Sequence, residues 1–154
     1  MIRNEKEYKE AIRRLGVDKV VIQKQEEALK KHNLSKEDIK RALDPIQSFH
    51  QQLIEEVHWY ESVKRKHFGV ISNLNEIGRL LIALRIASGL SQNDLAKCLT
   101  IAESQVSRDE RNEYHGISLE RAQKILSVFR VHVKAKVEID FPLERKEILA
   151  ALAH

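Results

Sequence analysis

The first 67 residues carry apolar positions at the spacing of helices. From residue 4 to about residue 31, apolar side chains recur every seven residues, which is typical of one helix face. They are Tyr8, Leu15, Ile22 and Leu29, with Ala11 and Ile12 beside the stripe. A second stripe at 3.6-residue spacing continues to about residue 67, and is formed by Ile46, Phe49, Leu53, Val57, Tyr60 and Val63. We therefore expect residues 1–70 to form a helical arm, most simply a hairpin.

The start of the second helix of this arm is marked by capping residues. Ser35 has Asp38 three residues on as a capping-box partner. Asp44 and Pro45 can end or kink this helix, or they can start a further one with Pro45 at its first position. The apolar stripe must also be covered. It can pack within the arm, on the rest of the chain, on a second copy or on a partner protein.

The segment 71–132 contains four predicted helices separated by clear helix-ending and helix-starting residues. The first covers about 74–88 and ends at Gly89, and the second covers about 92–99. The third runs from 103 to about 111, where Asn112 can adopt the left-handed conformation of a C-cap. The fourth begins after Ser118 and runs to about residue 130. This segment is predicted to be a compact helical domain.

The period of the pattern changes after residue 130. Apolar and polar residues alternate over 131–139, as in a half-buried strand, and Phe141 with Pro142 stops the alternation. Residues 143–153 can form a last short helix. A single strand cannot satisfy its own backbone hydrogen bonds, so we expect it to pair with the same strand of a second copy. The alternatives are an edge strand covered by the arm, or a last helix in place of the strand. The fold is thus predicted to be mainly α, with 133–154 as a dimerisation element.

Composition narrows the class of protein. The chain has 154 residues, 42% hydrophobic and 32% charged, with one cysteine, which excludes an intramolecular disulfide framework. The longest apolar stretch, Leu80–Leu84, is too short for a bilayer span, and the charged first residues do not fit a signal peptide. We expect a cytoplasmic protein without membrane contact. The net charge of +4 is compatible with nucleic-acid binding, but it does not distinguish a nucleic-acid-binding protein from other classes of protein.

Two short helices joined by residues 100–102 form the plan of a helix-turn-helix. The inner side chain at the helix crossing must be small, and Ala96 lies there. The joint is closed by the apolar residues Leu95, Leu99, Ile101 and Val106. The first turn and the outer face of the second helix are left free to contact base edges, and these exposed positions hold hydrogen-bonding side chains: Glu103, Ser104, Gln105, Ser107, Arg108 and Arg111.

The sequence Leu90–Ala96 (LSQNDLA) followed by Ser104–Arg108 (SQVSR) resembles the Xre-type helix-turn-helix of phage repressors, and the likeness extends over about 74–132. The resemblance implies a lambda-repressor-like domain that binds double-stranded DNA. It implies that Gln92 holds a phosphate and braces the reading helix. It further implies that Glu103, Ser104 and Arg108 face the major groove, with Arg108 on guanine and Glu103 on cytosine, and that Arg111 and Asn112 lie near the DNA backbone.

The chain departs from the family pattern at two positions. Thr100 stands where the joint usually has glycine, so we expect some strain in the turn. Asp109 stands where the family usually has a core aliphatic residue. Either Asp109 is ion-paired, with Arg111 or Arg121 as candidates, or the reading helix is rotated relative to the family.

The opening sequence Ile2–Tyr8 (IRNEKEY) is similar to that of HigA-type antitoxins, which join a helical segment to the same kind of DNA reader. Two functions therefore stay open. The first is a dimeric, sequence-specific repressor. The alternative is an antitoxin-like adaptor whose arm binds a partner protein while the helix-turn-helix regulates its own gene.

Signals for other chemistry are weak. His50 and His58 lie near one helix face without a metalloenzyme motif, and the chain has neither a phosphate-binding glycine loop nor a nucleophile elbow. We therefore expect no enzyme activity, metal or cofactor. Cys98 is interpreted as a packed or idle thiol. The basic run 64–67 suits the C-terminal end of a helix, or alternatively contacts flanking phosphates.

Overall fold

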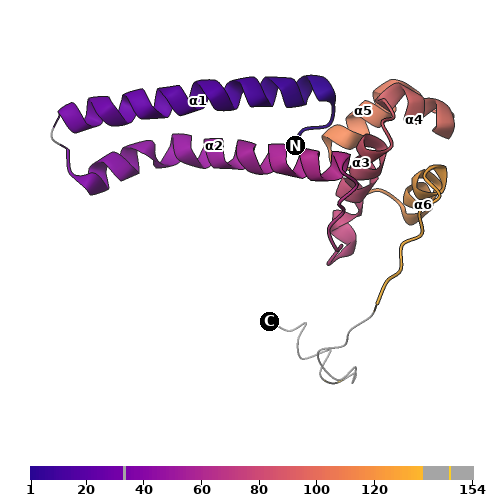
Figure 1. Ribbon diagram of the computed structural model, residues 1–154. Helices are drawn as coiled ribbons and strands as arrows, with labels where there is room; N and C mark the ends of the chain where they lie inside the picture. The colour runs from indigo at the N-terminus through magenta and orange to yellow at the C-terminus, as the bar shows by residue number, and fades with distance from the viewer. Residues whose placement is uncertain (33, 137–145, 147–154) are drawn as a thin grey trace.

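The computed structural model describes residues 1–32, 34–136 and 146, and the secondary structure of this part is helical (Figure 1). Its α-helices are α1 (Glu5–Lys31), α2 (Lys36–Lys64), α3 (Ile77–Ala87), α4 (Gln92–Leu99), α5 (Glu103–Arg111) and α6 (Leu119–Val128), and a short 3-10 turn, η1 (Leu74–Glu76), precedes α3. The long helices α1 and α2 lie side by side as an antiparallel hairpin, and α3 to α6 gather at one end of it. The predicted mainly helical fold with a hairpin arm is confirmed.

The hairpin is held by packing between its two helices at the end near α3. The rings of Tyr8 and Tyr60 stack with their centroids 5.1 Å apart. The Tyr8 hydroxyl donates a hydrogen bond of 2.8 Å to Glu61 Oε1, which raises the pKa of Tyr8. Ala11 of α1 and Val57 of α2 are buried in the same hydrophobic core as the helices of the following segment. The arm therefore packs on itself and, through α2, on the rest of the chain.

Three features of the arm differ from the sequence-based expectation. Helix α2 continues through Pro45, so the prediction of a separate helix starting there is wrong. Proline removes one backbone hydrogen bond, but α2 has buried side chains on both sides of it, at Leu43 and at Val57. Phe49 is 67% exposed and Ile12 is 43% exposed, so neither belongs to the buried stripe. Both residues lie on the faces that the hairpin turns toward solvent.

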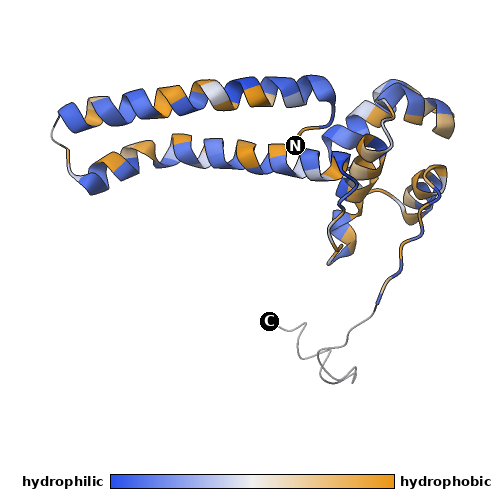
Figure 2. Cartoon of the chain, in the orientation of Figure 1, coloured by the Kyte–Doolittle hydropathy of each residue, from blue (hydrophilic) through white to orange (hydrophobic). Residues whose placement is uncertain are grey.

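Helix α3 forms the centre of the core. Every residue from Leu81 to Ile86 is buried, because α2 and α6 both pack on α3. Figure 2 shows the corresponding contrast, with α3 largely hydrophobic and α5 mainly hydrophilic. Asn73 caps a 3-10 turn before α3 instead of opening the α-helix itself, since its Oδ1 accepts from the backbone N–H of Asn75. Gly89 ends α3 with the expected left-handed conformation (φ 71°).

The loop between α5 and α6 makes a close approach to α3. The left-handed C-cap predicted at Asn112 is wrong, because its φ is −91° and the left-handed residues are Glu113 and Tyr114. These two residues turn the chain so that the Tyr114 ring is buried, and burial raises the pKa of Tyr114. The Glu113 carbonyl then lies against Gly78, where a Cβ atom would be only 1.9 Å from the carbonyl oxygen. The fold requires glycine at this position.

The structure describes residues 131–136 of the predicted C-terminal strand, and the strand is not present there. Residues 131–136 have no strand conformation, and Val133 is exposed. A strand needs a neighbouring strand to pair with, and no other segment in the described part of the chain is a strand. Positions 137–139 of the predicted strand, and the predicted last helix 143–153 apart from Lys146, lie outside the described residues.

Candidate nucleic-acid interface

Helix α4 starts at a complete capping box. The backbone N–H of Ser91 donates to Asp94 Oδ2 (2.9 Å), and the backbone N–H of Asp94 donates to Ser91 Oγ (3.1 Å). The hydrogen bonds from Ser91 also lower the pKa of the Asp94 carboxyl group, so the cap is ionised at neutral pH. This cap fixes where α4 begins and places Gln92 at its first position.

The joint between α4 and α5 turns at Thr100, which adopts the left-handed conformation (φ 57°, ψ 47°). The backbone N–H of Ile101 donates to the Ala96 carbonyl (3.0 Å), as in a glycine-capped helix end. Left-handed backbone is unusual for a β-branched residue and costs about 1–2 kcal/mol. The strain expected from threonine in place of glycine is therefore located at this residue. Leu95, Ala96, Leu99 and Val106 are buried at the joint, as predicted.

Helix α5 has one buried side and one open side. Val106 and Glu110 face the core, whereas Ser104, Arg108 and Arg111 are exposed. The three exposed residues follow the i, i+4, i+7 spacing and therefore share one face of the helix. Glu103 is exposed in the first turn, and Asn112 is exposed just after the last. The structure thus brings five of the eight predicted contact residues to one accessible surface.

The other three predicted contact residues are partly buried: Gln92, Gln105 and Ser107. Gln105 lies beside Arg121 of α6. When its amide oxygen is turned toward the guanidinium, it accepts from Arg121 Nη1 (3.2 Å) and Nη2 (3.1 Å). Arg121 also pairs with Asp109, so Asp109 is ion-paired with one of the two arginines proposed for it. These polar contacts join α5 to α6. The side of α5 that carries Gln105 and Asp109 therefore faces Arg121 of α6.

A buried ion pair holds the inner side of α5. Arg85 of α3 is 3% exposed and Glu110 is 1% exposed. Arg85 Nε donates to Glu110 Oε1 (2.5 Å), and Arg85 Nη2 donates to Glu110 Oε2 (2.7 Å), a bidentate arrangement. Gln92 Nε2 donates to the same Oε2 (2.8 Å). Glu110 therefore links α5 to both α3 and α4.

The remaining N–H groups of Arg85 bind backbone carbonyls. Nη1 donates to the Leu90 carbonyl and Nη2 donates to the Arg3 carbonyl, and each donor–acceptor distance is 2.9 Å. The first residues of the chain are thereby tied to the ion pair that positions α5. Sequence reasoning missed Arg85 and Glu110. The available signals were the arginine inside the apolar run 80–87 and the acidic residue one turn after Val106.

A small hollow of about 370 Å³ lies between the arm and the first turns of α4 and α5. Its lining includes Lys64 of the arm together with Gln92 and Glu103. Lys64 Nζ lies 4.0 Å from Glu5 Oε2, and this pair is half exposed and contributes little to stability. The basic end of α2 is therefore next to the predicted DNA-contacting residues.

Comparison with known proteins agrees with this geometry. Residues 81–135 match the family model described as helix-turn-helix. Neither the curated proteins nor the solved structures gave a significant match to the chain. Among the described helices, none combines the length and the apolar content needed to cross a bilayer.

Proposed function

We propose that this chain is a dimeric repressor that reads a specific DNA sequence with α5, because residues 81–135 match the helix-turn-helix family model and such domains occur in DNA-binding transcriptional regulators. The observation that carries the proposal is the exposed face of α5, where Ser104, Arg108 and Arg111 stand free of the core. The opposite side of α5 is fixed by Val106 and by the Glu110 ion pair. A rigid helix with an open polar face is what entry into the major groove requires.

The proposed roles follow from side-chain chemistry. Arg108 offers a bidentate grip to guanine O6 and N7, and Glu103 can accept from cytosine N4. Arg111 and Asn112, at the end of α5, are assigned to the DNA backbone. Gln92 is assigned to a phosphate, with its amide oriented by Glu110. Such binding blocks transcription by occupying the operator, and it takes place in the cytoplasm, where the DNA lies.

Selection of bound sequences from a random DNA duplex pool tests the whole proposal. We expect enrichment of one palindromic sequence with half-sites about 34 Å apart, because a two-fold dimer presents two copies of α5 one helical turn apart. Sedimentation of the free protein should show a dimer. A pool that stays random after selection would contradict sequence-specific binding, and a single half-site bound by a monomer would contradict the dimer.

Arg108→Ala should lower specific DNA affinity by about 1–3 kcal/mol and relax the preference at one base pair, since the bidentate contact is lost. The measurement is a titration of selected and random duplexes at fixed salt. Arg41→Ala is the matched control, because Arg41 is an exposed arginine on α2, outside the helix-turn-helix. Equal losses on both duplexes would make Arg108 a phosphate contact instead of a base reader.

A second function is favoured by the outer face of α1. Ile12, Gly16 and Val20 lie at i, i+4 and i+8, and Ile12 and Val20 are exposed. A Cβ atom added to Gly16 would meet nothing within 4 Å, so the fold itself does not need glycine there. Glycine inside a helix allows another backbone to approach closely. We therefore propose, as the alternative, that α1 docks a helix of a partner protein at Gly16.

Gly16→Ala separates folding from docking. We expect the free energy of unfolding to rise by about 0.5–1 kcal/mol, because alanine is the better helix former. Binding of a partner should weaken, because the methyl group occupies the approach. The partner to test is the product of a toxin-sized reading frame beside the gene, measured by co-purification and titration. A variant that is stabilised and still binds this product with unchanged affinity would refute docking at Gly16.

A further inference from the structure

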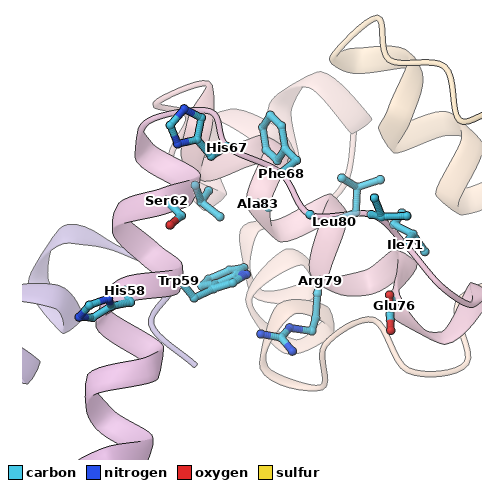
Figure 3. A pocket seen from close by; sticks show the side chains of 13 residues that line it. His58, Trp59, Ser62, His67, Phe68, Ile71, Glu76, Arg79, Leu80 and Ala83 are labelled. Atoms are coloured by element: carbon cyan, nitrogen blue, oxygen red, sulfur yellow. The ribbon is translucent and has the colours of Figure 1, made fainter.

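A second cavity lies away from α5, where the end of α2 meets the start of α3. It measures about 620 Å³, within the range of small-molecule sites, and none of the eight predicted DNA-contacting residues lines it. Seven of its thirteen lining residues are aromatic or aliphatic, among them Trp59, Phe68 and Leu80, and the polar ones include His58 and His67. Figure 3 shows Trp59, Phe68 and Leu80 around one common space.

The cavity carries one uncommitted charge, which is positive. The Arg79 guanidinium lies over the Trp59 ring, 5.5 Å from the ring centroid, and has no ion pair within the part of the chain that the structure describes. Glu76, the acidic residue of the lining, is already engaged in capping. Its carboxylate accepts from the backbone N–H of Ser72 (2.9 Å) and from Asn73 Nδ2 (3.3 Å).

The N–H donors of Arg79 are available to a ligand. No hydrogen bond among the described residues uses them, and the contact of Arg79 with Trp59 is a cation–π contact with Cζ 5.5 Å from the ring centroid. A guanidinium with available N–H groups can bind a carboxylate through two parallel hydrogen bonds. Figure 3 shows the two side chains next to each other at the edge of the cavity.

We propose that this cavity binds a small aromatic carboxylate. The aromatic ring of the ligand packs among Trp59, Phe68 and Leu80, where apolar area is removed from water. The carboxylate forms a bidentate pair with Arg79. This binding site is separate from the DNA-reading surface, so it does not depend on the function proposed above.

The tryptophan makes the proposal directly testable. Trp59 is the single tryptophan of the chain, so the protein has one indole N–H signal in a proton–nitrogen NMR spectrum. Titration with benzoate should move this signal saturably, with a Kd of about 1 mM. Benzamide has the same shape without the charge, and should bind at least about tenfold more weakly. Thermal unfolding should shift upward with benzoate, because the ligand binds only the folded state.

Three variants identify the charge that binds the ligand. Arg79→Gln should weaken benzoate binding at least about tenfold, whereas Arg130→Gln removes an exposed arginine after α6 and should leave it unchanged. Circular dichroism confirms that each variant is folded. Arg79→Lys keeps the charge without the bidentate edge, and should bind with intermediate affinity. The proposal is overturned if benzoate leaves the indole signal in place, if benzamide binds equally well, or if Arg79→Gln binds like the unmodified chain.

Discussion

Replacing Glu110 by alanine is expected to lower the free energy of unfolding by about 3–5 kcal/mol, because it leaves the buried guanidinium of Arg85 without its counter-charge. The substitution also removes the acceptor of Gln92 Nε2. Chemical denaturation followed by circular dichroism measures this loss. Since α5 loses its link to α3 and α4, specific DNA affinity should fall even at temperatures where the variant stays folded.

A double variant distinguishes the charge from the packing. Arg85→Met with Glu110→Leu removes both charges together and should recover much of the lost stability. Recovery should be incomplete, because the carbonyls of Leu90 and Arg3 lose their buried donor. If Glu110→Ala alone unfolded with nearly the stability of the unmodified chain, the ion pair would not be the element that fixes α5.

Replacing Gly78 by alanine is the second change with a large expected effect. The added methyl group would lie 1.9 Å from the Glu113 carbonyl oxygen and 2.9 Å from its carbon, both of them backbone atoms. Flexible side chains can move aside, but here α3 and the loop 113–114 must separate. We expect a loss of about 3 kcal/mol or more in the free energy of unfolding, at the upper end of overpacking effects.

The control for this prediction is Gly69→Ala, because a Cβ atom at Gly69 would meet nothing within 4 Å. That variant should unfold within about 0.5 kcal/mol of the unmodified chain. Thermal unfolding of both variants, side by side, separates a steric clash from a general effect of replacing glycine. Equal stability of the two variants would show that the loop moves away from α3 at little cost.

The elements that local chemistry specifies were predictable from the sequence. The starts of α2 and α4 follow from Ser35 and Ser91 with an aspartate three residues on, and hydrogen bonds within one helical turn form these caps. The chain leaves α3 through a left-handed residue at position 89, and glycine adopts this conformation without steric cost. Four of the six α5 residues that were predicted to be exposed are exposed, whereas Gln105 and Ser107, on either side of the buried Val106, are partly buried.

Contacts between distant segments could not be predicted in this way. The Arg85–Glu110 pair joins residues 25 positions apart. An arginine inside an apolar run indicates that it is buried, but no local pattern identifies Glu110 as its partner. Asn112 was a reasonable left-handed candidate by type, but the burial of Tyr114 determines which residues take that conformation. Alternation over 131–139 indicated a strand, yet a strand depends on a neighbour that no local pattern reveals.

The hydrogen bond from Arg85 to the Arg3 carbonyl has a consequence for the order of folding. It spans 82 positions, so it cannot form until the hairpin has closed and docked on α3. The contacts between α4 and α5 are local and can form early. We infer that α3 to α6 assemble first with one buried donor of Arg85 still unpaired. The docking of the hairpin and of Arg3 then completes the hydrogen bonding of Arg85 as the last step.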